Sequence, residues 1–93
     1  MTPCAWFDMT LAAAGDDGLR RAGLSAHEVL ALAGMTTPER MRFIGPDRLP
    51  DVYAASVGAE ELSPDLRRWV RAGAERMIAE IEAIESDAAP EKS

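Results

Sequence analysis

The side chains that could carry out chemistry are few in this chain, and they lie far apart. His27 is the single histidine and Cys4 is the single cysteine. These two residues supply neither a nucleophile with its base nor the four nitrogen or sulfur ligands of a typical zinc site. His27 falls in the first turn of a predicted helix, where we interpret it as a surface residue, with a pH-sensitive contact as the alternative.

Adjacent carboxylates occur twice, at residues 16–17 and 60–61, and both pairs fall in predicted turns. Such pairs could hold a hard cation, but no further carboxylates follow at the spacing of a metal-binding loop. Residues 15–18 also fail as a phosphate loop, because two aspartates stand where the phosphate would bind. We therefore predict that the protein is not an enzyme and that it has no catalytic residues, no metal and no cofactor.

Length and charge narrow the class of protein further. The 93 residues suffice for one domain, and the net charge of −6 argues against a general binder of nucleic acids or membrane surfaces. A single cysteine allows no intrachain disulfide, which fits a reducing compartment. The apolar residues 4–14 lack a basic flank and are too short to cross a bilayer, so we expect neither a signal peptide nor a membrane anchor. The sequence thus predicts a cytoplasmic protein.

Four sites have the sequence of a helix start. Ser25 begins a capping box that Glu28 completes. The other three sites share a hydroxyl residue followed by proline: Thr2-Pro3, Thr37-Pro38 and Ser63-Pro64. In each pair the hydroxyl can accept a free backbone N–H, and proline at the first helical position has no N–H to leave unpaired.

Glycines that follow apolar stretches predict where these helices end. We expect a left-handed conformation after a helix at four of them: Gly15, Gly34, Gly45 and Gly58. The predicted helices span residues 3–14, 25–33, 38–44, 50–57 and 64–86, with a possible short turn at 16–22. No segment alternates at the period of a strand.

The resulting fold class is all-α. We predict a small bundle of four to five helices, in which short helices pack on one long C-terminal helix. Residues 1–86 form the single helical domain, and residues 87–93 form a disordered tail. In the first helix Phe7 and Leu11 have core spacing, and we interpret the neighbouring Trp6 as a core residue, with stacking on a ligand as the alternative.

Residues 24–45 have the pattern of a helix, a tight turn and a second helix. The pattern rests on eight residues: Leu24, Ser25, Glu28, Val29, Leu32, Gly34, Met35 and Thr36. They resemble the helix-turn-helix of the MerR and excisionase type, which implies DNA binding through Arg40, Arg42 and Arg48. The chain departs from that motif at Arg40, where an inward apolar residue is expected, and Met41 comes one position later.

The alternative for residues 24–45 is a helical hairpin that packs on its neighbours. The second helix is short and offers no Asn, Gln or Ser to bind base edges, although the wider segment of residues 19–48 carries five arginines against three carboxylates. The surface around Arg40 and Arg42 separates the two interpretations. A convex basic face would favour DNA, and an apolar or acidic groove would favour a protein.

The predicted helix over residues 64–86 has one apolar face. Its arginines come early and its glutamates late, an order that the helix dipole disfavours. Two such helices laid antiparallel would relieve this conflict, so we predict a homodimer or partner interface through ten residues: Leu66, Trp69, Val70, Met77, Ile81, Ile84, Arg67, Arg71, Glu82 and Glu85. In the alternative, the apolar face packs on the chain's own helices.

These observations favour a non-catalytic protein–protein interaction module. We expect it to act as an adaptor or inhibitor of a larger protein partner, as a homodimer, and it resembles in class the small modulators that phages and plasmids encode. The alternative is a helix-turn-helix transcriptional regulator that binds DNA. Nucleic acid is thus the less favoured partner, and no membrane is expected.

Overall fold

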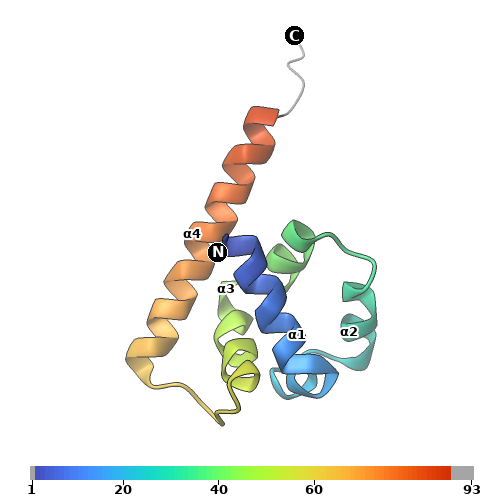
Figure 1. Cartoon of the computed structure of the whole chain (residues 1–93), viewed down its shortest axis with the longest axis vertical. Coiled ribbons are helices and arrows are strands. Elements are labelled where there is room, and N and C mark those ends of the chain that lie inside the picture. Colours follow the sequence, from blue (N-terminus) through green and yellow to red (C-terminus); the bar gives the residue numbers. More distant parts are fainter. Residues whose placement is uncertain (1, 89–93) are drawn as a thin grey trace.

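The computed structural model describes residues 2–88, which form four α-helices (Figure 1). The helices are α1 (Pro3–Arg21), α2 (Ala26–Leu32), α3 (Thr37–Ser56) and α4 (Pro64–Ala88). No strand occurs in this part of the chain, so the all-helical prediction is confirmed. Helix α4 includes Asp87 and Ala88, which we had predicted for the tail, whereas residues 89–93 lie outside the described residues.

Three of the four predicted helix starts are confirmed. The Thr2 hydroxyl accepts the backbone N–H of Ala5 at 3.1 Å, and the Ser63 hydroxyl accepts that of Leu66 at 3.2 Å. At α2 the Ser25 hydroxyl accepts the Glu28 N–H, and the Glu28 carboxylate accepts the Ser25 N–H, so the capping box is complete. These interactions span three residues, which is why the sequence alone predicts them.

The predicted cap of α3 is wrong by one residue. Thr36, and not Thr37, is the N-cap, because only Thr36 lies three residues before Glu39 and can form the reciprocal capping box. Pro38 therefore occupies the second helical position. The released Thr37 hydroxyl donates instead to the Asp8 carboxylate of α1 at 3.0 Å.

Two glycines interrupt helices where the sequence predicted ends. Gly15 within α1 has φ +68° and Gly45 within α3 has φ +75°, conformations that favour glycine. Helical structure resumes at once after Gly45, so the predicted linker between residues 44 and 50 is helical. The prediction for Gly34, which follows α2, is wrong, since its φ is not positive. Gly23, which follows α1 and was not predicted to end a helix, does have a positive φ.

Helices α1 and α3 form the centre of the fold, with α4 and α2 on opposite sides of this pair (Figure 1). Gly18 allows the close approach of α1 to α3, since a Cβ there would lie 3.1 Å from the Cβ of Ala55. The buried apolar residues come from all four helices and the turns between them: Phe7, Leu19, Ala22, Leu24, Leu32, Met41, Ile44, Leu49, Val52, Ala54, Leu62, Val70 and Ala74.

The C-terminal part of α4 extends past the other three helices, and the described molecule is 50 Å long in that direction (Figure 1). Helix α4 packs against α3, and its Val70 and Ala74 belong to the core. Because the C-terminal part of α4 extends past the other helices, its side chains can contact another molecule.

Candidate interaction surfaces

Two of the three arginines proposed for DNA binding hold helix ends inside the chain. The Arg40 Nε donates to the carbonyl oxygen of Leu32, the last residue of α2, at 2.8 Å. The Arg48 guanidinium donates to the carbonyls of Ile44 and Phe43 at 3.1 and 2.6 Å, beside the break at Gly45. Arginine at these positions satisfies backbone acceptors at a helix end, which is a structural role.

Arg48 also connects α3 to the start of α2. Its guanidinium lies 3.3 Å from the Glu28 carboxylate and 5.3 Å from the centroid of the Phe43 ring. The hydrogen bond from the Ser25 backbone N–H, followed by the one from Arg48, lowers the pKa of Glu28 below its usual value of 4.5. The same carboxylate thus serves the cap of α2 and the ion pair.

Arg42, the third arginine proposed for DNA, forms an ion pair with Glu85 near the projecting end of α4, at 2.7 Å. All three arginines therefore have polar partners within the chain. The sequence could not show the contacts with Leu32, Glu28 and Glu85, because these partners lie 8 to 43 residues away.

Arg40 lines a groove of about 300 Å³ between α1, α2 and the start of α3. We call it the α1–α2 groove. Two exposed carboxylates, Asp8 and Asp16, share its lining with Arg40, and the remaining lining is apolar: Leu11, Ala12, Leu19, Val29, Leu32 and Ala33. The surroundings of Arg40 are thus apolar and acidic, the condition under which we expected a protein partner.

Part of the α4 face that was predicted as an interface packs in the core of the chain, and the rest is exposed. Val70 is only 3% exposed and belongs to the core, and Met77 and Ile81 pack partly against that core. Leu66, Trp69 and Ile84 remain exposed, the last two at 66% each. The packing of the first group on the chain's own helices is the alternative that the sequence left open.

The charges of α4 also divide. Three of those placed in the interface pair with α3 instead: Arg67 with Asp51, Arg71 with Asp47, and Glu85 with Arg42. Along α3, Arg42 comes first and the two aspartates follow, which is the reverse of the order of charges in α4. The late aspartates of α3 therefore meet the early arginines of α4, and the early Arg42 meets the late Glu85. Glu82 is exposed and takes part in none of the ion pairs between described side chains.

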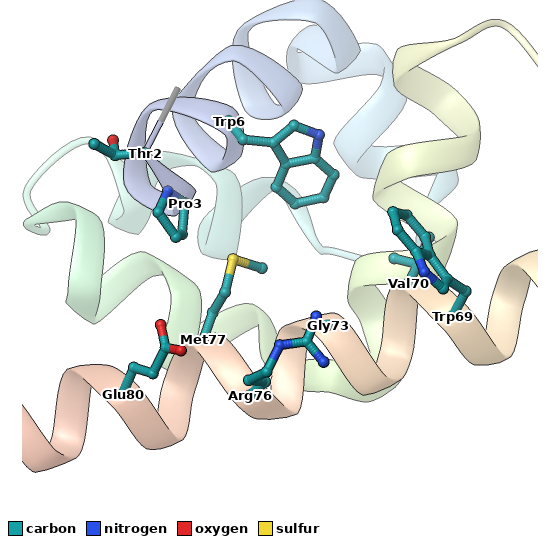
Figure 2. Close-up of a pocket in the computed structure, with 9 residues that line it drawn as sticks. All are labelled: Thr2, Pro3, Trp6, Trp69, Val70, Gly73, Arg76, Met77 and Glu80. Carbon is teal, nitrogen blue, oxygen red and sulfur yellow. The ribbon is translucent and has the colours of Figure 1, made fainter.

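A second groove, of about 360 Å³, lies between the start of α1 and the middle of α4. We call it the α1–α4 groove. Figure 2 shows Trp6 and Met77 directed into the gap from opposite helices, with Trp69 at one end and Glu80 toward the other. Trp6 is half-buried and stacks on Tyr53 with ring centroids 5.9 Å apart, so it joins the core and lines the groove at once.

The sequence missed this groove as a site. Thr2 and Pro3 line it, yet the sequence marks them only as a helix start. The available signal was the presence of Trp6 and Trp69 on two different predicted helices. Nothing local in the sequence indicates that these helices meet.

The residues that the structure describes contain no group of three or more His, Cys, Asp or Glu side chains that could hold a metal ion. His27 is exposed, and Cys4 is a partly buried free thiol. Among the described helices, none has the length and apolar character that crossing a membrane requires.

Comparisons with protein-family models, with curated proteins and with solved structures find no match for this chain.

Proposed function

We propose that the protein is a non-catalytic adaptor or inhibitor that binds a larger protein through the α1–α2 groove. We also propose that it acts as a homodimer, in the cytoplasm, where a lone cysteine stays reduced. The observation that carries the proposal is the composition of that groove, where an apolar floor lies beside the carboxylates of Asp8 and Asp16.

The chemistry of the groove defines the expected partner segment. An apolar anchor of that segment would fill the space between Leu11 and Val29, and flanking lysines or arginines would face the two carboxylates. The net charge of −6 supports attraction of a basic segment over a distance.

The proposal is tested by site-specific photocrosslinking in cells of the native host. A photoreactive residue replaces Ala33, which is exposed in the groove, and a matched control replaces Ala31, which is exposed on α2 but lines neither groove. We expect a crosslinked product with a larger protein from position 33 and not from position 31. The product should disappear when Asp16→Arg is added, and its absence with intact Asp16 would contradict the proposal.

The alternative of a DNA-binding regulator is tested with labelled duplex DNA at physiological salt. We expect no shift of the DNA by the parent protein, because Arg40, Arg42 and Arg48 already have partners within the chain. A shift by the parent that is lost in the Arg40→Ala/Arg42→Ala variant and falls steeply with added salt would favour the regulator instead.

A further inference from the structure

We propose that the α1–α4 groove is occupied by a second copy of this chain, which inserts the projecting part of its own α4. The two copies are related by a two-fold axis, and each fills the groove of the other. This inference rests on the homodimer in the proposed function and specifies its geometry. The interface predicted along most of α4 is thereby narrowed to a specific pairing of residues between the two α4 helices.

The outward face of α4 has the spacing of a helix–helix seam. Six residues recur at intervals of three or four along it: Leu66, Trp69, Gly73, Arg76, Glu80 and Ile84. All of them except Gly73 are exposed, and four of them line the α1–α4 groove. Val70 and Ala74, which packs with it in the core, lie on the neighbouring face. Helix α4 therefore uses one face for its own chain and presents another.

The charges on this outward face fix the direction of the second helix. Arg76 and Glu80 take part in none of the ion pairs between described side chains, unlike Arg67, Arg71 and Glu85. An antiparallel pair with its axis near residue 78 sets Arg76 of each copy against Glu80 of the other. A parallel pair would set arginine against arginine and glutamate against glutamate, which is unfavourable.

The same register gives Ile84 a place in the partner's groove. With Arg76 facing Glu80, Ile84 of one copy lies opposite residues 72–73 of the other. Gly73 has no side chain, and a Cβ added there would have a single neighbour within 4 Å, the Arg76 guanidinium at 3.9 Å. Ile84 can therefore enter beside Trp69 and Met77 and remove an exposed apolar side chain from water.

A second copy fits this surface better than an unrelated protein, because the surface is complementary to itself. A two-fold interface requires one patch to supply both members of each contact. Here the outward face of α4 carries both Arg76 and Glu80. The same helix lines one side of the groove and carries Ile84, the side chain that would fill it. The projecting end of α4 lies outside the body of its own chain, where a second body can receive it (Figure 1).

The test is sedimentation of the purified full-length chain over a range of micromolar concentrations, with charge reversals on the seam. Arg76→Glu and Glu80→Arg each create two like-charge pairs, one on either side of the two-fold axis, and we expect each variant to raise the dimer dissociation constant about tenfold or more. The Arg76→Glu/Glu80→Arg variant restores opposite charges, and it should return to within about threefold of the parent. Glu82→Arg is the matched control, since residues two apart lie on opposite sides of a helix, and it should leave the dimer unchanged.

Ile84→Asp provides a second measurement that does not depend on Arg76 or Glu80. Because Ile84 is exposed in the single chain, this variant should fold normally by circular dichroism and sediment as a monomer. A parent that remains monomeric at high micromolar concentration would overturn the proposal. A dimer that responds to Glu82→Arg as strongly as to Glu80→Arg would overturn it as well. Neither result affects crosslinking from Ala33, so failure of the dimer is distinguishable from failure of the proposed function.

Discussion

The arginines of residues 24–45 and Arg76 on α4 look alike in the sequence but have different surroundings in the structure. Arg40 is hydrogen-bonded to the end of α2, and Arg42 is paired with α4. Arg76 lines a groove beside an exposed tryptophan, and it has no ion-pair partner among the described side chains. A charge that already has a partner in its own chain stabilises the fold, whereas a charge without one is available to another molecule.

The same contrast occurs between adjacent residues of α4. Val70 is 3% exposed, and Trp69 beside it is 66% exposed. Both belonged to the interface that the sequence predicted, because helical periodicity shows which residues share a face and not what that face contacts. Helix α3 covers one part of the face, and this leaves a narrower stripe for a partner.

The largest expected difference in stability is between two variants, in which aspartate replaces either Val70 or Trp69. Val70→Asp places an unpaired charge in the core, and we expect it to lower the free energy of unfolding by about 4 kcal/mol or more, enough to unfold a small domain. Trp69→Asp should change the unfolding free energy of the single chain by less than about 1 kcal/mol.

Urea unfolding monitored by circular dichroism measures both variants, at a concentration where the parent is monomeric. Comparable destabilisation by Trp69→Asp and Val70→Asp would show that the outward stripe is part of the core, and the division of α4 into two faces would then be wrong.

A smaller effect should separate the two kinds of arginine. Arg48→Ala removes hydrogen bonds to two carbonyls and the ion pair with Glu28, and we expect a loss of about 1–2 kcal/mol of unfolding free energy. Arg76→Ala should change the stability of the single chain by less than about 0.5 kcal/mol, because it removes no described ion pair. Equal losses in the two variants, measured by thermal unfolding, would contradict this assignment.

The helix starts show how much of the fold can be predicted from the sequence. Thr2, Ser25 and Ser63 cap the helices that we predicted from them, because a cap and its N–H lie three residues apart. The error at Thr36 and Thr37 arose where two hydroxyl residues compete and the position of Glu39 decides. Local chemistry predicts local structure well, with errors of about one residue.

The breaks within helices were harder to predict. Gly45 has the positive φ that we expected, yet Pro46 follows it directly and lets a new helical turn begin there, since proline suits a first turn. The contacts that define the sites lie beyond the range of such rules. Arg48 and Glu28 are 20 residues apart in the sequence. Trp6 is further still in sequence from the α4 residues that line the same groove. These contacts depend on how helices pack, which the sequence pattern does not encode.

The pH dependence of stability tests the internal role of Arg48 from its partner's side. The pKa of Glu28 is lowered in the folded chain, first by the Ser25 N–H and then by Arg48, from a usual value of 4.5. A lowered folded pKa means that the ionised form stabilises the fold. This contribution is complete above the usual pKa and is lost as the pH falls through the folded pKa.

We therefore expect the melting temperature of the parent to fall as the pH drops below about 4.5. The fall should be shallower in Glu28→Gln, which removes the titrating group, and in Arg48→Ala, which removes one cause of the shift. Superimposable pH curves for the parent and Glu28→Gln would contradict this role of the carboxylate.

The smallest expected effect concerns the pair of Arg42 with Glu85, which joins the start of α3 to the projecting end of α4. Both side chains are partly exposed, and exposed pairs contribute little because water and salt screen them. A double-mutant cycle with Arg42→Ala and Glu85→Ala should give a coupling free energy of about 0.2–1 kcal/mol, reduced further by added salt. Such a weak link leaves the end of α4 free to pack into a second copy, as the proposed dimer requires. A coupling above about 1.5 kcal/mol that persists in high salt would mean that the pair is part of the rigid fold. The end of α4 would then be held by its own chain, and it would not be free to enter the groove of a second copy.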